Sequence, residues 1–282
     1  MLNAMSQSNR SSFSPKPHAA VSTMSDAFFS DRKSKALTAL LLTFVSGMVD
    51  IIGYFGIYKL FTAHMTGTTV HLASSLVYGD KSAGIAAGVI VAAFFLGSIV
   101  GRIVVELGSR ARFRTVASAT LTLEIVLIVA VAMGTPLNLA RPVLGDFLPY
   151  WRLAFLSAAM GLQTATLTRV GALTVHTTFV TGMINKLAQL VSHVLFRSYD
   201  LFRLFGSERK EIRATRNQDA RRALFLFAIW CLYLGGAASG ALLYRSWNLS
   251  ALYFASGLLV VPVFTDQVWP LSLEEEKEQS ER

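Results

Sequence analysis

The chain has 282 residues, of which 53% are hydrophobic and 15% are charged, and its mean hydropathy is +0.49. This composition excludes an ordinary water-soluble domain, in which about 25% of the residues are charged. The formal net charge of +9 does not indicate a nucleic-acid partner, because Lys and Arg gather at the ends of apolar segments and form no single cationic face. We therefore expect an integral membrane protein whose main partner is the lipid bilayer.

The chain begins with a serine-rich segment, residues 1–35, which contains Pro15 and Pro17 and lacks the apolar core of a signal peptide. Its composition predicts a disordered, cytoplasmic N-terminal segment. Residues 265–282 form a second polar segment that is rich in Glu. The transmembrane domain is expected to lie between them, at 36–264.

Eight largely apolar segments follow in chain order, at about 36–58, 64–78, 83–105, 115–133, 150–170, 176–196, 223–244 and 249–264. Basic clusters flank them at 32–35, 110–114 and 197–222, and such clusters face the cytoplasm in membrane proteins. If all eight segments crossed, the first two clusters would lie on opposite sides. If 64–78 and 176–196 do not cross, all three clusters share one side. This predicts about six transmembrane helices in the cell membrane, with both termini cytoplasmic.

The two segments that are not expected to cross resemble each other. The shared positions are Thr66-Gly67 with Thr181-Gly182, upstream Gly47 with Gly161, and downstream FFLGSIVG (94–101) with LYLGGAASG (232–240). Two such copies, at about 36–133 and 150–264, would have opposite orientations in the membrane. The pattern predicts an all-α fold with an inverted internal repeat and two short polar or re-entrant helices. In transporters with inverted repeats, interrupted helices bind the solute near the midplane.

Polar side chains recur along the first of these segments. His64, Thr68, His71 and Ser75 are spaced at i, i+4, i+7 and i+11, which places them on one face of a helix. A helix that starts at Thr66-Gly67 would present unpaired N–H groups to an anion or a carbonyl. The alternative is that Thr-Gly serves only as a helix cap or as a packing notch between helices.

Two carboxylates lie inside apolar segments, Asp50 in SGMVDIIG and Glu124 in TLTLEIVL. A charge at the bilayer centre costs about 2.5 to 3.5 kcal/mol on insertion scales, so each residue needs an explanation. The functional interpretations are solute contact, a proton relay that includes His64, or an ion pair with Arg169 or Lys186. The structural alternative is a buried hydrogen bond.

Enzyme motifs are missing from the sequence, which contains no Gly-x-Ser-x-Gly, Walker loop, His-Glu-x-x-His or Cys-x-x-Cys. We expect no enzyme activity and no cofactor. Cys231 is the one cysteine, so an intramolecular disulfide is impossible. His64 and His71 are two helical turns apart, which is too far to hold one ion without help, so no metal site is expected.

Small residues at helical spacing predict close helix packing in the third and seventh segments. They are Gly97, Gly101, Gly235, Ser239 and Gly240.

The first half of the chain resembles the YoaK-like proteins, a family of polytopic membrane proteins without an assigned activity. The resemblance rests on Gly47, Asp50 and Gly53, on His64-Met65-Thr66-Gly67, and on the echo Thr177, Thr178, Thr181 and Gly182. Thr68 stands where the family usually has Asn. The resemblance covers about 36–264 and implies a polytopic membrane fold, but it supplies no activity.

These observations favour a small-molecule permease, either proton-coupled or uncoupled, with a solute that the sequence does not identify. The predicted solute-binding residues are Asp50, His64, Thr66, Gly67, Thr68, His71, Glu124, Thr178, Thr181 and Gly182. The alternative is a sensor, assembly or scaffold protein that does not transport and binds a lipid or a partner helix. Both functions are compatible with a homo-oligomer.

Overall fold

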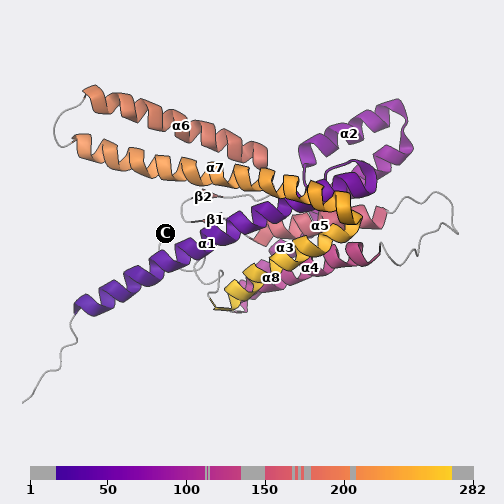
Figure 1. The fold of residues 1–282 in the computed structure, drawn as a ribbon, viewed down its shortest axis with the longest axis horizontal. Helices are drawn as coiled ribbons and strands as arrows, with labels where there is room; N and C mark the ends of the chain where they lie inside the picture. The colour runs from indigo at the N-terminus through magenta and orange to yellow at the C-terminus, as the bar shows by residue number, and fades with distance from the viewer. Residues whose placement is uncertain are drawn as a thin grey trace, which may run out of the picture.

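The computed structural model describes residues 17–111, 113, 115–134, 150–166, 169–170, 173–174, 179–203 and 208–268, and gives the backbone alone at 17–34, 169–170, 173–174 and 208. This part of the chain is almost entirely helical (Figure 1). Its elements are α1 (Pro17–Gly53), the π-helical turn η1 (Tyr54–Tyr58), α2 (Met65–Tyr78), α3 (Lys81–Arg110), α4 (Val116–Met133), α5 (Tyr150–Thr166), strands β1 (Arg169–Val170) and β2 (Leu173–Thr174), α6 (Val180–Arg203), α7 (Glu208–Trp247), the 3-10 turn η2 (Asn248–Ala251) and α8 (Leu252–Val268).

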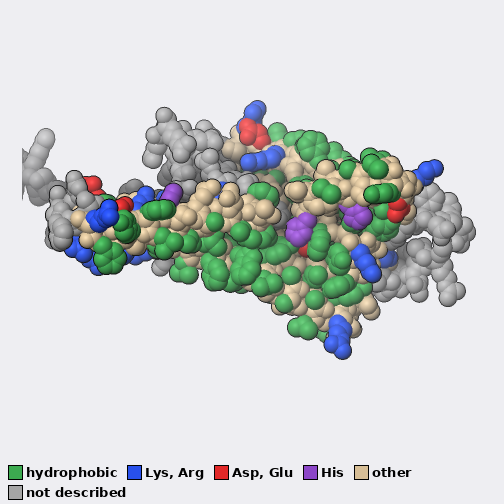
Figure 2. All heavy atoms as spheres, turned by 90° about the horizontal axis from the view of Figure 1, so that it is seen from above, with side chains coloured by type: hydrophobic (Ala, Val, Ile, Leu, Met, Phe, Trp, Pro, Cys, Tyr) green, Lys and Arg blue, Asp and Glu red, His purple; other side chains and the backbone are tan. Residues whose placement is uncertain are grey.

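Four stretches of the described residues are long and apolar enough to cross a bilayer. They are Lys35–Tyr58, Lys81–Arg110, Val116–Met133 and Arg209–Val268, the last of which contains α7, η2 and α8. Large hydrophobic side chains are exposed over much of the face in Figure 2, whereas Lys and Arg gather mainly near its ends. Exposed apolar side chains on helices of this length are expected where lipid surrounds them. The predicted all-helical membrane protein is therefore confirmed.

Helix α1 starts earlier than the composition predicts. Residues 1–35 are expected to be disordered, yet the backbone is helical from Pro17 onward. Proline suits the first position of a helix, where its missing N–H has no intrahelical partner. The segment also continues without interruption into the apolar span, which removes the cost of nucleating a separate helix.

Two helix pairs, α1 with α7 and α3 with α5, cross at glycines where the backbones touch. A Cβ on Gly47 of α1 would lie within 3.0 Å of the Tyr233 carbonyl oxygen and the Ala237 amide nitrogen of α7. A Cβ on Gly236 of α7 would meet the Phe44 backbone of α1 equally closely. These glycines allow the two backbones to approach in a way that larger residues would prevent.

The second crossing repeats the first position by position. A Cβ on Gly161 of α5 would lie within 3.0 Å of the Phe94 oxygen and the Ser98 nitrogen of α3. A Cβ on Gly97 of α3 would meet the Ala158 backbone of α5. The first helix of each half of the chain thus packs against the long apolar helix of the other half, through glycines that match along the sequence.

The match differs by one residue from the sequence alignment, which pairs Gly97 with Gly235. The contacts pair Gly97 with Gly236 and Gly101 with Gly240, and all four would clash if they carried a Cβ. A Cβ on Gly235 would meet only the Phe44 ring, at 3.8 Å, which is an ordinary contact. Gly235 therefore lies beside the crossing. Because Gly235 and Gly236 are consecutive, an alignment of sequence motifs does not show which of the two is at the crossing. Ser239 is half-buried.

Helices α4 and α8 complete the core beside α5. The Asp266 Oδ2 of α8 accepts hydrogen bonds from the Ser118 amide at 2.8 Å and the Ser118 hydroxyl at 2.7 Å. It satisfies an amide in the first turn of α4, as a capping carboxylate does. On the α5 side, the Thr166 hydroxyl donates to Thr120 Oγ1 at 2.8 Å. Fully buried aliphatic side chains of α1, α4, α5 and α8 fill the space between these helices.

Helices α2 and α6, which the sequence predicts as the short polar pair, lie beside this core, to which α6 contributes Met183. Each packs on the long helix that follows it, α2 on α3 and α6 on α7. The α6 and α7 pair extends away from the other packed helices, to the same side as the N-terminal part of α1 (Figure 1). An ion pair between Arg197 of α6 and Asp219 of α7 links the two helices there.

Candidate functional site

Asp50 lies near the end of α1, where the helix widens into η1 and the chain turns back. Its Oδ1 accepts three hydrogen bonds, from the Thr62 amide at 3.0 Å, the Thr62 hydroxyl at 2.8 Å and the Ala63 amide at 3.0 Å. The side chain is only 1% exposed. Lys59, with φ of 53°, makes the left-handed turn that returns the chain. Asp50 therefore anchors the loop that leads into α2.

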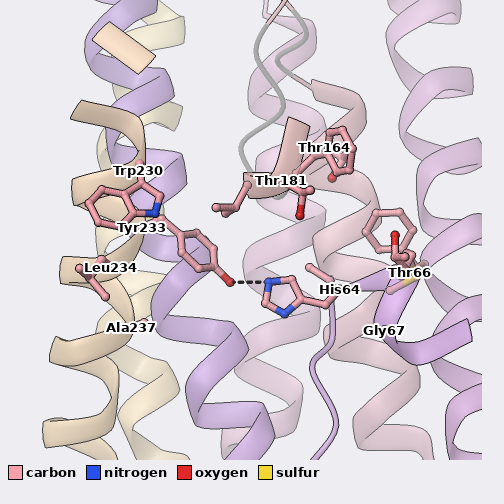
Figure 3. A pocket seen from close by; sticks show the side chains of 14 residues that line it. His64, Thr66, Gly67, Thr164, Thr181, Trp230, Tyr233, Leu234 and Ala237 are labelled. Atoms are coloured by element: carbon pink, nitrogen blue, oxygen red, sulfur yellow. Dashed lines mark hydrogen bonds between the residues drawn. The ribbon is translucent and has the colours of Figure 1, made fainter. Parts of the chain in front are cut away.

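The second carboxylate oxygen of Asp50 belongs to a short chain of polar groups. The Tyr233 hydroxyl of α7 donates to Asp50 Oδ2 at 2.7 Å, and it lies 3.2 Å from Nε2 of His64 (Figure 3). Because the Tyr233 hydroxyl donates its proton to Asp50, its oxygen can accept a hydrogen bond from His64 Nε2–H. His64 Nε2 lies 3.9 Å from Asp50 Oδ2. His64, Tyr233 and Asp50 form what we call the relay.

A cavity of about 680 Å³ opens beside the relay. Its lining includes Thr66 and Gly67 from the start of α2 and Thr181 from the start of α6, together with His64 and Tyr233 of the relay. Figure 3 shows these residues around one space, with the hydrogen-bonded Tyr233 and His64 at its side. The two Thr-Gly segments, 115 residues apart in the chain, thus reach the same cavity.

Both of these helices turn their N-terminal ends to the cavity. The first amide in the α2 ladder is that of Thr68, which donates to the His64 carbonyl at 3.0 Å, and in α6 it is that of Met183, which donates to Phe179 at 3.2 Å. The amides of Thr66 and Thr181 come before these bonds, in the first turn, where helices have no intrahelical acceptor. The N-terminal ends carry partial positive charge. The arrangement suits a solute that has a carboxylate or a carbonyl group.

Apart from Thr164, the rest of the lining is aromatic and apolar. It consists of Ala63, Met65, Phe94, Thr164, Phe179, Val180, Trp230, Leu234 and Ala237. Leu234 and Phe179 are also exposed at the surface, so the cavity has an apolar rim. A site with an apolar wall and a few convergent polar groups is typical of small-molecule binding.

Some of the predicted site residues do not line this cavity. Thr68 is buried, and its hydroxyl donates to the His64 carbonyl of its own helix at 3.0 Å. Ser75 donates likewise to the His71 carbonyl at 2.8 Å, and the His71 side chain is exposed. Of the polar stripe predicted along this segment, His64 lines the cavity, whereas Thr68, His71 and Ser75 do not. Thr and Ser can satisfy their hydroxyls on the preceding turn of a helix, and periodicity alone does not detect this.

The other predicted residues have different positions. A Cβ on Gly182 would collide with the Phe179 ring, so Gly182 makes room for a lining residue without lining the cavity itself. Glu124 is on α4 and does not belong to the lining. Thr178 lies outside the described residues. Nearby Gly53 accommodates Thr62 and Leu156 side chains, so its small size serves packing and not a solute.

Sequence reasoning missed Tyr233 and Phe94, although a signal for both was present. Gly47 packs on the backbone of Tyr233 and Gly161 on that of Phe94, and each glycine had been recognised as a repeated position. Both aromatic residues line the cavity. Within the described residues, no group of three or more His, Cys, Asp or Glu side chains could hold a metal ion.

Comparison with known proteins gives a family and one relative. Residues 38–265 match the family described as "Protein of unknown function (DUF1275)". The UPF0700 transmembrane protein YoaK of Bacillus subtilis (strain 168) is 27% identical over 157 residues, which cover 55% of this chain and 67% of YoaK. No solved structure matches the chain. The resemblance to YoaK-like proteins, and with it the transmembrane class, is confirmed.

Proposed function

Since the chain belongs to the DUF1275 family of transmembrane proteins, for which no activity is assigned, we propose from the site itself that it is a small-molecule permease. The observation that carries this proposal is the cavity where the starts of α2 and α6 meet, with the relay in its wall. Transporters with interrupted helices bind their solutes at such helix ends.

The proposed permease has an inverted repeat, in which α1 to α4 correspond to α5 to α8. Support comes from the two glycine crossings, where Gly47 and Gly161, and likewise Gly236 and Gly97, occupy matching places. The cavity lies where the two halves meet, because its lining comes from α2 and α3 in one half and from α5, α6 and α7 in the other. Rocking of one half against the other would open such a cavity to each side in turn.

The repeat requires an odd number of crossings in each half. We propose six crossings in total, by α1, α3, α4, α5, α7 and α8, with α2 and α6 not crossing. This places the basic clusters at 32–35, 110–114 and 197–222 on the cytoplasmic side together with both termini.

Transport coupled to protons is the specific mechanism we propose. His64 is 36% exposed and reaches the cavity, whereas Asp50 is buried and contacts His64 through Tyr233. A proton taken up from the cavity by His64 would change the charge next to the solute, since an imidazole can bind and release a proton. The preferred solute is a small carboxylate or amide, which the two helix starts can bind through backbone amides.

Proton-coupled uptake by the purified protein in liposomes tests the proposal. A panel of small carboxylates and amides is first screened for thermal stabilisation, and those that stabilise are offered to liposomes containing a pH-sensitive dye. We expect at least one solute to move protons across the bilayer together with itself. Stabilisation without any solute or proton movement would contradict transport.

That outcome would favour the alternative of a lipid-binding or partner-binding protein. The apolar rim at Phe179 and Leu234 supports this alternative, because an acyl chain or a neighbouring helix could enter the cavity there.

A further inference from the structure

Glu124 lies in the middle of α4 on the face that packs into the core. The buried positions on this face are Ala117, Leu121, Glu124, Ile128 and Val131, at spacings of three and four residues. Leu121 and Ile128, one turn before and one turn after the carboxyl, are completely buried in the hydrophobic core. Glu124 is itself 0% exposed. Its carboxyl group is therefore enclosed by the apolar packing between α4, α5 and α8.

Within the part of the chain that the structure describes, neither carboxyl oxygen of Glu124 has a hydrogen-bond partner. No ion pair with Glu124 occurs among the described residues. The titratable or charged groups on the helices packed against α4 are Lys81, Arg102, Glu106 and Arg110 of α3, Tyr150 and Arg152 of α5, and Tyr253 and Asp266 of α8. Among the described residues, none of them forms a hydrogen bond with Glu124: Arg152 donates to the Gly134 carbonyl, Glu106 pairs with Arg110, and Asp266 accepts from Ser118.

The other buried carboxylates of the core show what a structural role requires. Asp50 accepts from the amides of Thr62 and Ala63 and from two hydroxyls, and Asp266 accepts from the amide and hydroxyl of Ser118. Each holds two chain segments together through charge-assisted bonds. Glu124 makes no such bond, so it contributes nothing of this kind to the packing of α4.

An ionised carboxylate in these surroundings would be very unstable. Transfer of an isolated charge into an apolar medium is so costly that the group takes up a proton and becomes neutral instead. We propose that Glu124 is a proton-binding carboxyl, held as the neutral acid between α4, α5 and α8 and separate from the relay at the cavity. Release of its proton requires these helices to part, which links its protonation to a change in helix packing.

The proposal predicts a specific chemical reactivity. A neutral carboxylic acid within an apolar membrane protein adds to a hydrophobic carbodiimide such as dicyclohexylcarbodiimide. The acid proton goes to a carbodiimide nitrogen and the carboxyl oxygen bonds to the central carbon, and the adduct then rearranges to an N-acylurea without losing any atom. An ionised carboxylate lacks the proton that the first step needs.

Infrared spectroscopy of the full-length protein at neutral pH is the first test. We expect the carbonyl stretch of a protonated carboxylic acid in the wild type and its loss in Glu124→Gln, which replaces the neutral acid by a neutral group of the same shape. Loss of the carboxylate stretch instead would overturn the proposal, because Glu124 would then be ionised.

The carbodiimide reaction provides a second test that needs no variant. Dicyclohexylcarbodiimide should modify the peptide that contains Glu124 at neutral pH, as detected by mass spectrometry. A water-soluble carbodiimide should modify Glu106, whose side chain is 63% exposed, and leave Glu124 unmodified. If Glu124→Gln does not fold, this reaction decides: an adduct at Glu124 supports the proposal, and its absence overturns it.

Discussion

Asp50 combines two tasks that are often separate in a membrane protein. Through Oδ1 it holds the loop before α2, and through Oδ2 it receives the Tyr233 hydroxyl beside the cavity. In the proposed permease, Asp50 can therefore influence solute binding without contacting the solute. Its charge acts on the cavity through Tyr233 and His64.

Replacement of Asp50 separates the two tasks. In Asp50→Asn, the amide oxygen can still accept from Thr62 and Ala63, and the amide nitrogen can donate to Tyr233. We therefore expect near-normal folded yield but loss of proton-coupled uptake. Asp50→Leu leaves several buried donors unpaired, at about 1 to 3 kcal/mol each, and should strongly lower the thermal midpoint.

Thermal unfolding and uptake, measured side by side, check this prediction. A suitable control is Asp80→Asn, since Asp80 caps α3 at the Ala83 amide in a more exposed position and asparagine caps a helix about as well, so the thermal midpoint should hardly change. A well-folded Asp50→Leu protein with normal uptake would remove Asp50 from both roles.

Tyr233→Phe interrupts the relay while keeping the aromatic ring. His64 and Asp50 would then face each other at 3.9 Å without the hydroxyl between them. We expect a folded protein whose solute binding persists but whose uptake no longer depends on pH. Tyr244→Phe is the matched control, because Tyr244 lies on the same helix and bonds only to the Phe55 carbonyl among described contacts. Equal pH dependence in both variants would exclude the relay.

At the scale of helices, the two glycine crossings set how closely the halves of the chain approach. Gly235 and Gly236 are neighbours on α7 with opposite roles, since only Gly236 faces the Phe44 backbone. Gly235→Ala should be neutral or stabilising, because alanine favours a helix interior over glycine by about 1 kcal/mol. Gly236→Ala should cost about 1 to 3 kcal/mol or more through overpacking.

Folded yield and thermal midpoint of these two variants check the crossing directly. Gly97→Ala should behave like Gly236→Ala, because Gly97 has the matching place in the α3 and α5 crossing. Equal behaviour of Gly235→Ala and Gly236→Ala would show that the crossing does not have the register described above.

The sequence predicted the helices better than the residues of the site. Apolar runs identified the core helices, and the Thr-Gly repeat identified the two helix starts that meet at the cavity. Helical periodicity also pointed to Thr68 and His71, which do not line the cavity: the Thr68 hydroxyl bonds to its own helix, which leaves no trace in the pattern, and His71 is exposed away from the lining. Tyr233 was missed because aromatic residues are common in membrane spans, and only the fold brings it to Asp50.

For the whole molecule, the proposed inverted repeat makes a prediction about topology. The turn at 79–82 between α2 and α3 should lie on the outer side, and the loops at Arg110 and Arg209 on the cytoplasmic side. Reporter fusions at these three places measure the side of each. An Arg110 loop on the outer side would contradict both the six crossings and the repeat.

The most direct test of a permease is access to the cavity from both sides of the membrane. Cys231 is the one cysteine, so Cys231→Ser provides a background for Thr66→Cys and Thr181→Cys, one at each helix start. Vesicles of both orientations are treated with a maleimide that does not cross membranes, and labelling of each cysteine is measured. A permease predicts labelling of both positions from either side, because the cavity opens to each side in turn. Labelling of both cysteines from one side alone, whatever the conditions, would contradict transport through this cavity.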